Sequence, residues 1–243
     1  MAITDPERKR AAGLSQQQLP LAVHLRDDAT MDNFLALPQT LPLMDALQSQ
    51  MQPEGEAVIY LYGPPGTGKS HLLQACCHLA ETETLYLPLA QLREYPPGEV
   101  LQGVDRLDRI CLDDIHAVLG DPDWELALFN LYNSVRQEDR RLVVAGDAAP
   151  RALEVQLPDL RSRLSWAVVY QLVEGSDEEK SAILQFRAMR RGLSLSAGVA
   201  SFIVSRAPRA MEQLLGVLDQ LDEASLAQQR ALSIPFVKEA LGW

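Results

Sequence analysis

The sequence predicts an α/β protein, in which a parallel sheet with a phosphate-binding loop is followed by a small helical unit. Three observations lead to this prediction. Short apolar runs typical of buried parallel strands alternate with segments of helical periodicity in the first part of the chain. A complete G-x-x-x-x-G-K-[ST] motif occupies residues 63–70, directly after the first of these runs. From residue 174 onwards the chain contains helical patterns and no strand-like run.

Composition bounds the class of protein. The chain has 243 residues, enough for one large α/β domain and a small second unit, and 47% hydrophobic content excludes disorder of the whole chain. No apolar run reaches the roughly 18 residues that span a bilayer, and the basic N-terminus lacks the apolar segment of a secretory signal. Cys76, Cys77 and Cys111 show no C-x-x-C spacing, so we expect buried free thiols in a reducing cytoplasm.

The net charge of −11 lowers the expectation of direct DNA binding. Proteins that neutralise DNA phosphates along a groove are usually basic on that face. Arginines cluster at 151–163 and 187–191, so acidity alone does not exclude nucleic acid.

The phosphate-binding loop has the flanks that such a loop needs. Residues 58–62 form an apolar, β-rich run before it, and apolar residues at helical spacing follow it. This arrangement points backbone N–H groups and a helix N-terminus at a polyphosphate. Lys69 is expected to contact the outer phosphates and the Ser70 hydroxyl to ligate Mg²⁺. The predicted nucleotide-binding residues are Gly63, Pro64, Pro65, Gly66, Thr67, Gly68, Lys69, Ser70 and His71.

Before the loop, residues 1–15 are polar, charged and without periodicity, so we expect them to be disordered. Residues 16–21 then form a short apolar plug. Its leucines either are the first residues to dock on the domain or enter a partner's pocket as a linear motif, and the residues alone favour the first interpretation. Residues 30–37 predict a packed segment near the nucleotide, and residues 41–51 predict a helix.

After the loop helix, residues 84–88 predict a second strand, and a short helical piece breaks at Pro96-Pro97. Residues 109–112 then form an apolar run that ends in Asp113 and Asp114. Ligands gather at the carboxyl ends of parallel strands, so these carboxylates are expected beside the phosphate loop. We predict that Asp113 holds Mg²⁺, directly or through water, and that Asp114 orients a water or senses the γ-phosphate.

Residues 121–139 predict a long helix, and residues 141–145 a buried strand that ends at Gly146-Asp147. Asp147 either hydrogen-bonds the attacking water or γ-phosphate, or caps the following turn; on physical grounds alone the cap is favoured. Residues 157–164 predict a short helix, and residues 168–172 a fifth strand. Arg161 and Arg163 on that helix cannot share one face, so at most one of them is aimed at a given site.

The remainder predicts four helices. Ser176 and Glu179 form a capping box for a helix that stops at Gly192, and helices at about 196–206, 208–228 and 234–241 follow. Pro208 is expected to begin the third of them, with Arg209 in its first turn. A cation there opposes the helix dipole unless an anion binds nearby. Arg209 is therefore a candidate phosphate sensor.

Together these pieces resemble the AAA+ P-loop ATPases, which have a five-stranded parallel α/β core and a small C-terminal helical lid. Within that superfamily the chain resembles the bacterial initiator DnaA group from about residue 16 to the end. The resemblance implies that Arg163 takes the arginine-finger position and that Arg209 is the sensor 2 arginine. The matching segments are Leu112–Ile115 at Walker B, Ala145–Asp147 at sensor 1, Leu160–Trp166 at Box VII, Pro208–Glu212 at sensor 2 and Ile234–Ala240 at the end of the lid.

The resemblance also bears on the two ends of the chain. DnaA continues into a helix-turn-helix DNA-binding domain, whereas this sequence ends at Trp243, an outline that resembles the short DnaA paralogues that regulate DnaA inactivation. In that family an N-terminal Q-L-x-L-P-L peptide binds the sliding clamp. The peptide here departs at its second position but keeps Gln16, Leu19, Pro20 and Leu21, which reverses the preference stated above. The implied organisation is a tail with the clamp-binding peptide over 1–22, a nucleotide-binding core over 23–174 and a lid over 175–243.

Two functions from different classes follow. The first is a regulator that binds ADP or ATP with Mg²⁺, sits on the DNA polymerase III sliding clamp and presents Arg163 to ATP held by DnaA, which inhibits the initiation of DNA replication. Its own NTPase activity is then weak or absent, and it reaches DNA at most through the clamp. The second is an autonomous ATPase motor or loader that turns over its own ATP. Self-assembly into homo-oligomers stays open under both.

Overall fold

The computed structural model describes residues 24–79 and 82–243. The predicted clamp-binding peptide, with Gln16, Leu19, Pro20 and Leu21, lies outside the described residues.

Five parallel strands form one sheet in the order β2-β3-β4-β1-β5. β3 and β4 are buried along their whole length, whereas β5 at the edge is half-exposed. The chain crosses from β1 to the far edge and returns, so the carboxyl ends of β1, β3 and β4 come together at one rim of the sheet. The strands are β1 (Val58–Tyr62), β2 (Thr84–Pro88), β3 (Arg109–Asp113), β4 (Arg141–Gly146) and β5 (Val168–Gln171).

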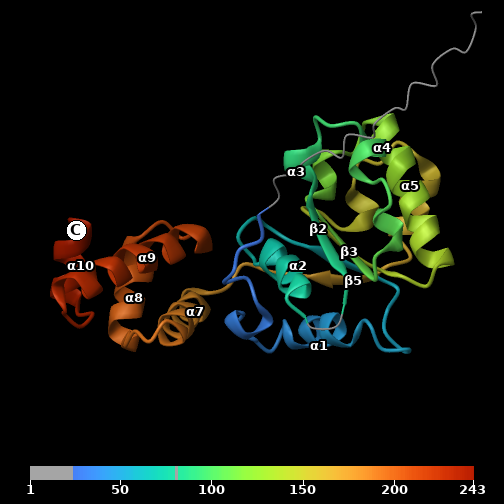
Figure 1. Ribbon diagram of the computed structural model, residues 1–243. Helices are drawn as coiled ribbons and strands as arrows, with labels where there is room; N and C mark the ends of the chain where they lie inside the picture. The colour runs from blue at the N-terminus through green and yellow to red at the C-terminus, as the bar shows by residue number, and fades with distance from the viewer. Residues whose placement is uncertain (1–23, 80–81) are drawn as a thin grey trace, which may run out of the picture.

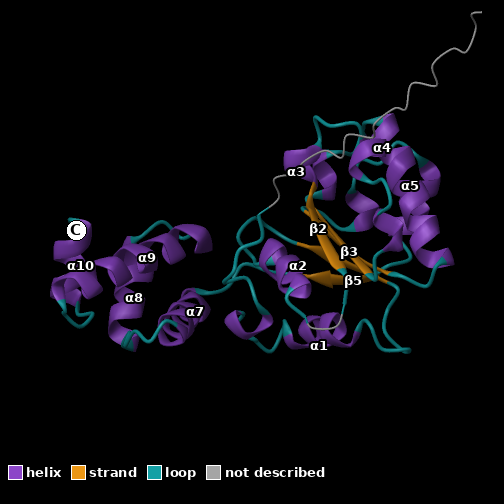
Figure 2. Cartoon of the chain, in the orientation of Figure 1, coloured by secondary structure: helices purple, strands orange, loops and turns teal. Residues whose placement is uncertain are grey.

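Helices cover both faces of the sheet (Figures 1 and 2). Alternate residues of β1, β3 and β4 face two separate hydrophobic cores, as the period of a strand requires. One core packs against α1 and α2, and the other against α5 and α6. The helices of this part are α1 (Leu41–Ser49), α2 (Lys69–Cys77), α3 (Leu89–Leu92), α4 (Pro97–Val100), α5 (Pro122–Gln137) and α6 (Pro158–Leu164), with 3₁₀ turns η1 (Met31–Asn33), η2 (Val104–Arg106), η3 (Ile115–Ala117) and η4 (Pro150–Ala152).

Four further helices form a unit beside the α/β part, and they bury a core of their own (Figure 1). They are α7 (Asp177–Arg190), α8 (Ala197–Arg206), α9 (Met211–Gln228) and α10 (Ile234–Leu241). The predicted capping box is present: Glu179 N–H donates to Ser176 Oγ at 3.2 Å, and Ser176 N–H donates to Glu179 Oε2 at 2.8 Å. The predicted α/β core with a helical lid is therefore confirmed. No helix within residues 24–79 and 82–243 is long and apolar enough to cross a membrane.

Several local predictions were wrong. α9 begins at Met211 because Ala207 and Ala210 adopt extended backbone, so Pro208 and Arg209 precede the helix and the dipole argument for Arg209 does not hold. The short helical piece α3 does end before Pro96-Pro97, but Pro97 also begins a further short helix, α4, which the sequence did not predict, as its fixed φ allows at a first helical position. β5 ends at Gln171, one residue earlier than expected.

The cysteines are free thiols, as predicted, and Cys76 and Cys111 are buried. Cys77 is only half-buried.

Candidate nucleotide-binding site

The phosphate loop joins β1 to α2, and its backbone needs glycine at two positions. Gly68 is the N-cap of α2 with φ of 95°, and a Cβ there would lie 2.7 Å from Cε2 of Phe34. A Cβ on Gly63 would lie 2.0 Å from the carbonyl oxygen of Leu172. Thr67 Oγ1 donates to the Pro64 carbonyl at 2.9 Å and closes the loop on itself. The loop is thus packed from outside by residues far away in sequence, and only glycine fits at these contacts.

Lys69 lies across the loop that it follows. Its side chain is buried, and Nζ donates to the carbonyls of Gly63 at 2.6 Å and Pro64 at 2.9 Å. Burial lowers the pKa of Lys69, and the charges of Asp113, Asp114 and Asp147 oppose that decrease. The three carboxylates and the ammonium group therefore share one electrostatic environment, as the predicted site requires.

Asp113 ends β3 as a buried carboxylate with both oxygens engaged. Oδ2 accepts a hydrogen bond from the Tyr86 hydroxyl at 2.8 Å, and Oδ1 accepts one from the Asp114 backbone N–H at 3.0 Å. Burial raises the pKa of Tyr86, and the Asp113 charge adds to that increase, so the phenol stays a donor. Sequence reasoning missed Tyr86. The only available signal was its place in the neighbouring predicted strand, two residues before the register partner of Asp113.

Asp114 follows in the left-handed backbone region, with φ of 53°, and is half-buried. Burial raises the pKa of its carboxyl group, and the charge of Asp113 adds to the increase. Ser70 lies exposed in the first turn of α2. Within the described part of the chain, no group of three His, Cys, Asp or Glu side chains is arranged to hold a metal on its own.

Asp147 follows β4 and is exposed. Its Oδ1 lies 3.7 Å from Nδ1 of His116, a buried ring nitrogen with no hydrogen-bond partner among the described residues. The following 3₁₀ turn has Ala149 at its N-cap and no side-chain cap. The preference for Asp147 as a turn cap was therefore wrong, because the chain bends at Asp147 and Ala148 and the turn begins only after Ala149, which has no side chain that could cap it.

The segment before α1 covers the loop, as the sequence predicted. His71 Nε2 donates to the Thr30 carbonyl at 2.8 Å, and the His71 and Phe34 rings lie 5.6 Å apart with an interplanar angle of 44°. Because the carbonyl can only accept, Nε2 carries the proton. Burial lowers the pKa of His71, which favours the neutral imidazole. His71 therefore tethers this segment to α2.

The lid approaches the loop from the other side. A Cβ on Gly66 would lie 3.8 Å from the backbone nitrogen of Met211, so the N-terminus of α9 faces the phosphate loop. Arg209 lies two residues earlier, mostly exposed, and its guanidinium is 3.4 Å from Asp177 of α7. The fold thus brings the predicted sensor segment to the loop, while the Arg209 side chain pairs with the lid.

The two arginines of α6 point in different directions, as predicted. The Arg161 guanidinium donates to the Val155 carbonyl, whereas the Arg163 guanidinium lies 4.6 Å from the ring centroid of the exposed Trp166. Within the described residues, the interactions of Arg163 do not involve the phosphate loop or its carboxylates. Sequence reasoning did not single out Trp166.

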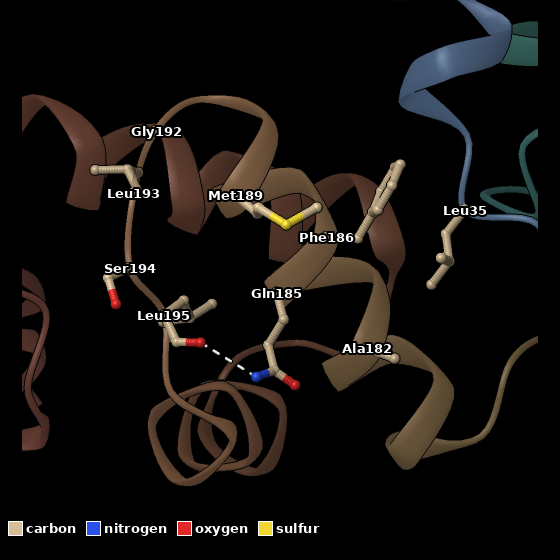
Figure 3. A pocket seen from close by; sticks show the side chains of 9 residues that line it. All are labelled: Leu35, Ala182, Gln185, Phe186, Met189, Gly192, Leu193, Ser194 and Leu195. Carbon is tan, nitrogen blue, oxygen red and sulfur yellow. Dashed lines mark hydrogen bonds between the residues drawn. The ribbon is translucent and has the colours of Figure 1, made fainter.

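A hollow of about 710 Å³ lies between α7, the loop after it and the segment before α1 (Figure 3). Gln185 Nε2 donates to the Leu195 carbonyl at 3.2 Å along one wall. The hollow is lined by Leu35, Ala182, Gln185, Phe186, Met189, Gly192, Leu193, Ser194 and Leu195. It contains no residue of the phosphate loop and is therefore separate from the phosphate site.

A phosphate loop after the first strand, carboxylates at the ends of β3 and β4, and a four-helix lid define an AAA+ P-loop ATPase domain. Residues 26–171 match the model of the bacterial DnaA ATPase domain, and residues 177–241 match that of the Hda lid domain. The chain belongs to the bacterial DnaA ATPase family, and within it to the Hda-like paralogues.

Several known proteins are similar to this chain in sequence or in fold. An uncharacterized protein of Haemophilus influenzae is 40% identical over 229 residues, which cover 93% of this chain and 98% of the relative. Domain III of the Thermotoga maritima replication initiation protein DnaA has a TM-score of 0.74 at 21% identity, covering 90% of this chain and 98% of that one. AMPPCP-bound DnaA from Aquifex aeolicus has a TM-score of 0.70 at 18% identity, covering 82% of this chain and 66% of that one.

Proposed function

We propose that this chain is a nucleotide-bound regulator of replication initiation that stimulates hydrolysis of the ATP held by DnaA, together with the DNA-loaded sliding clamp. Initiation is thereby inhibited. The observation that carries this proposal is the environment of Arg163: the residue is half-buried, its guanidinium lies 4.6 Å from the Trp166 ring centroid, and it forms no ion pair with a carboxylate of the described residues. An arginine supplied to a neighbour's P-loop site accelerates phosphoryl transfer by roughly 10³–10⁵.

The proposed ligand is ADP or ATP with Mg²⁺. Lys69, the loop N–H groups and the N-terminus of α2 would hold the phosphates, with His71 and the segment it tethers beside them. Asp113, oriented by Tyr86, and the exposed hydroxyl of Ser70 would hold the metal, with phosphate and water as the other ligands. The metal supplies charge neutralisation between the phosphates. Asp114 and Asp147 would orient a water or sense the γ-phosphate, and Arg209 would exchange Asp177 for phosphate.

The N-terminal peptide would bind the sliding clamp. Gln16, Leu19, Pro20 and Leu21 keep most of the family's clamp-binding pattern. An extended tail with a few apolar anchors is a common way to attach a regulator to a partner while the folded part stays free to act. DNA would be contacted through the clamp, and self-association is compatible with this arrangement.

The decisive experiment substitutes Arg163→Ala and measures hydrolysis of DnaA-bound ATP in the presence of clamp loaded on DNA. We expect stimulation to fall by at least roughly 10³-fold, while folding, ADP binding and clamp binding stay unchanged. Arg161→Ala is the matched control, because it removes the same charge from the same helix but faces Val155. If Arg163→Ala stimulates DnaA as the parent does, the mechanism is wrong, and Arg161 becomes the candidate.

An autonomous ATPase is the second candidate function. The observation that favours it is that the charges of Asp113, Asp114 and Asp147 all act on Lys69, so the main charged P-loop groups share one electrostatic environment. A steady-state ATPase assay of the chain alone, and with DnaA and clamp on DNA, separates the candidates. Turnover by the chain alone that Lys69→Ala removes and that DnaA does not change would support the motor.

A further inference from the structure

Trp166 is an exposed aromatic residue that contacts Arg163, and the function proposed above assigns it no role of its own. It lies two residues after the last residue of α6, and 58% of its surface is exposed to solvent. Two guanidinium groups lie against its ring: that of Arg163 at 4.6 Å from the centroid and that of Arg136, near the end of α5, at 5.9 Å. A large aromatic surface left in water next to two cations is a constellation that packing alone does not require.

No described carboxylate lies within ion-pair distance of these two arginines, Arg136 and Arg163, in a chain of net charge −11. Burial raises the pKa of the nearby Tyr132 hydroxyl, and both guanidinium groups oppose that increase, so their fields converge at one place. Within residues 24–79 and 82–243, the arginines that form ion pairs with carboxylates are Arg26, Arg93, Arg140, Arg141, Arg187, Arg190, Arg191, Arg209 and Arg230.

We propose that Trp166 is a positioning residue for Arg163, and that the edge formed by Arg136, Trp166 and Arg163 fits the polyphosphate of a nucleotide held by a partner subunit. The inference rests on the proposed function. A carboxylate could also hold the guanidinium, but it would neutralise the charge and occupy the N–H donors that phosphate needs. The face of an indole attracts the cation through its quadrupole and leaves the charge and the donors available.

Pre-organisation is the physical benefit. A free arginine side chain has many rotamers, and ordering it at the moment of reaction would weaken its effect on the transition state. Stacking on Trp166 restricts the guanidinium before the partner arrives. Arg136 comes from a different helix and adds a second positive charge to the same edge, which favours encounter with an anionic partner more than it favours the chemical step.

The experiment compares Trp166→Leu with Trp166→Phe in the DnaA hydrolysis assay. Trp166→Leu should lower the maximal stimulated rate by roughly 2- to 30-fold, the range that a cation–π contact spans between exposed and desolvated sites. The concentration for half-maximal stimulation should change by less than about twofold. Trp166→Phe keeps an aromatic face and should retain most of the rate. Arg136→Gln should instead raise the half-maximal concentration by roughly two- to fivefold and weaken its dependence on salt.

A readout in the isolated protein removes the dependence on the partner. The ¹⁵N relaxation of the Arg163 Nε–H group should report greater mobility in Trp166→Leu and parent-like order in Trp166→Phe, with ADP affinity and thermal midpoint unchanged in both. Parent-like mobility or parent-like stimulation in Trp166→Leu would overturn the inference. If Arg163→Ala itself retains stimulation, the proposed function fails instead, so the two failures are distinguishable.

Discussion

At the scale of single residues, the charge balance around Lys69 defines what the site can bind. The charges of three carboxylates act on one ammonium group, and burial raises the pKa of Asp114 while it lowers that of Lys69. Both shifts disfavour the charged form when no ligand is present. A nucleotide polyphosphate with its metal would supply the charges that these groups lack, with the anion toward Lys69 and the cation toward Asp113. This electrostatic fit supports the proposed ligand.

His71 makes a prediction about pH. Burial lowers its pKa in the folded state, so below the ordinary value of about 6.5 the unfolded state binds more protons. The free energy of unfolding should therefore fall as the pH decreases through this window, by at most about 1.4 kcal/mol per pH unit from this group. In His71→Gln, which can still donate to the Thr30 carbonyl, that part of the pH dependence should disappear.

Urea denaturation of parent and variant at pH 7.5, 6.5 and 5.5 measures the difference directly. His78→Gln is the control, because His78 is exposed and reaches the Arg26 carbonyl from the same helix at 3.3 Å. Identical pH dependence in the parent and His71→Gln would contradict the prediction.

At the scale of elements, α7 is the helix that joins the lid to the α/β part. Near its C-terminus, the buried Arg187 pairs with Asp28 and donates to the Asn33 carbonyl at 3.0 Å. At its N-terminus, the capping-box residue Glu179 also accepts from Gln39 Nε2 at 2.7 Å. α7 therefore contacts the segment before α1, and His71 of α2 donates to the Thr30 carbonyl of the same segment. The lid, this segment and the phosphate loop are therefore linked by direct contacts.

The Arg187 contact can be tested against a neighbour on the same helix. Arg187→Ala should lower the free energy of unfolding by about 1–3 kcal/mol, because it leaves the Asn33 carbonyl and part of Asp28 without a partner. Arg190→Ala should cost less than about 1 kcal/mol, since Arg190 is 44% exposed and its ion pair with Asp32 is 3.9 Å long.

Hydrogen exchange should locate the effect of Arg187→Ala in α7 and the segment before α1. Equal destabilisation by the two substitutions would show that the buried contact has no special role.

At the scale of the whole molecule, a bound nucleotide should act on both units, because the loop and the N-terminus of α9 face each other across Gly66. At a ligand concentration of 100 times Kd, binding stabilises the folded state by about 2.7 kcal/mol, which raises Tm by roughly 5–11 °C in a chain of this size. Lys69→Ala should abolish this shift. Lys69 also donates to two loop carbonyls, so without ligand the Lys69→Ala variant should have a free energy of unfolding roughly 1 kcal/mol lower than the parent.

Differential scanning calorimetry with and without ADP provides the measurement. An ADP-dependent shift that survives in Lys69→Ala would refute the assignment of the phosphate site.

The N-terminal tail makes the last prediction. Deletion of residues 1–22 should abolish clamp binding and leave ADP affinity unchanged, because apolar anchors such as Leu19 and Leu21 usually dominate a peptide interface. Size-exclusion chromatography of the parent and the truncated protein, each mixed with clamp, measures binding. The double substitution Leu19→Ala and Leu21→Ala in the full chain removes the same anchors without shortening the chain, and should lose clamp binding as well. Co-elution of the truncated protein with clamp would contradict the clamp-binding role of the peptide.

Most of the fold could be predicted from short stretches of the sequence. The phosphate loop, the carboxylates after the third strand and the capping box at Ser176 each lie within a few residues, and their backbone requirements or hydrogen bonds are local. The succession of strands and helices follows from apolar periodicity, which a single sequence displays directly. Where the local rule was ambiguous, it failed: Pro208 satisfies the preference for a helix start, but the helix begins at Met211.

Only the tertiary structure decided which distant groups meet. Three contacts depend on how separate elements pack: Tyr86 with Asp113, Arg187 with Asp28, and Arg136 with Trp166. No single segment of the sequence contains the information that sets this packing. The same holds for the direction of Arg163, since both arginines of α6 have the same local environment in sequence. The sequence by itself determined the chemistry of the loop and the kind of fold, because those depend on residue type and short spacing. The tertiary structure decided which side chains orient that chemistry, because orientation is a property of long-range contacts.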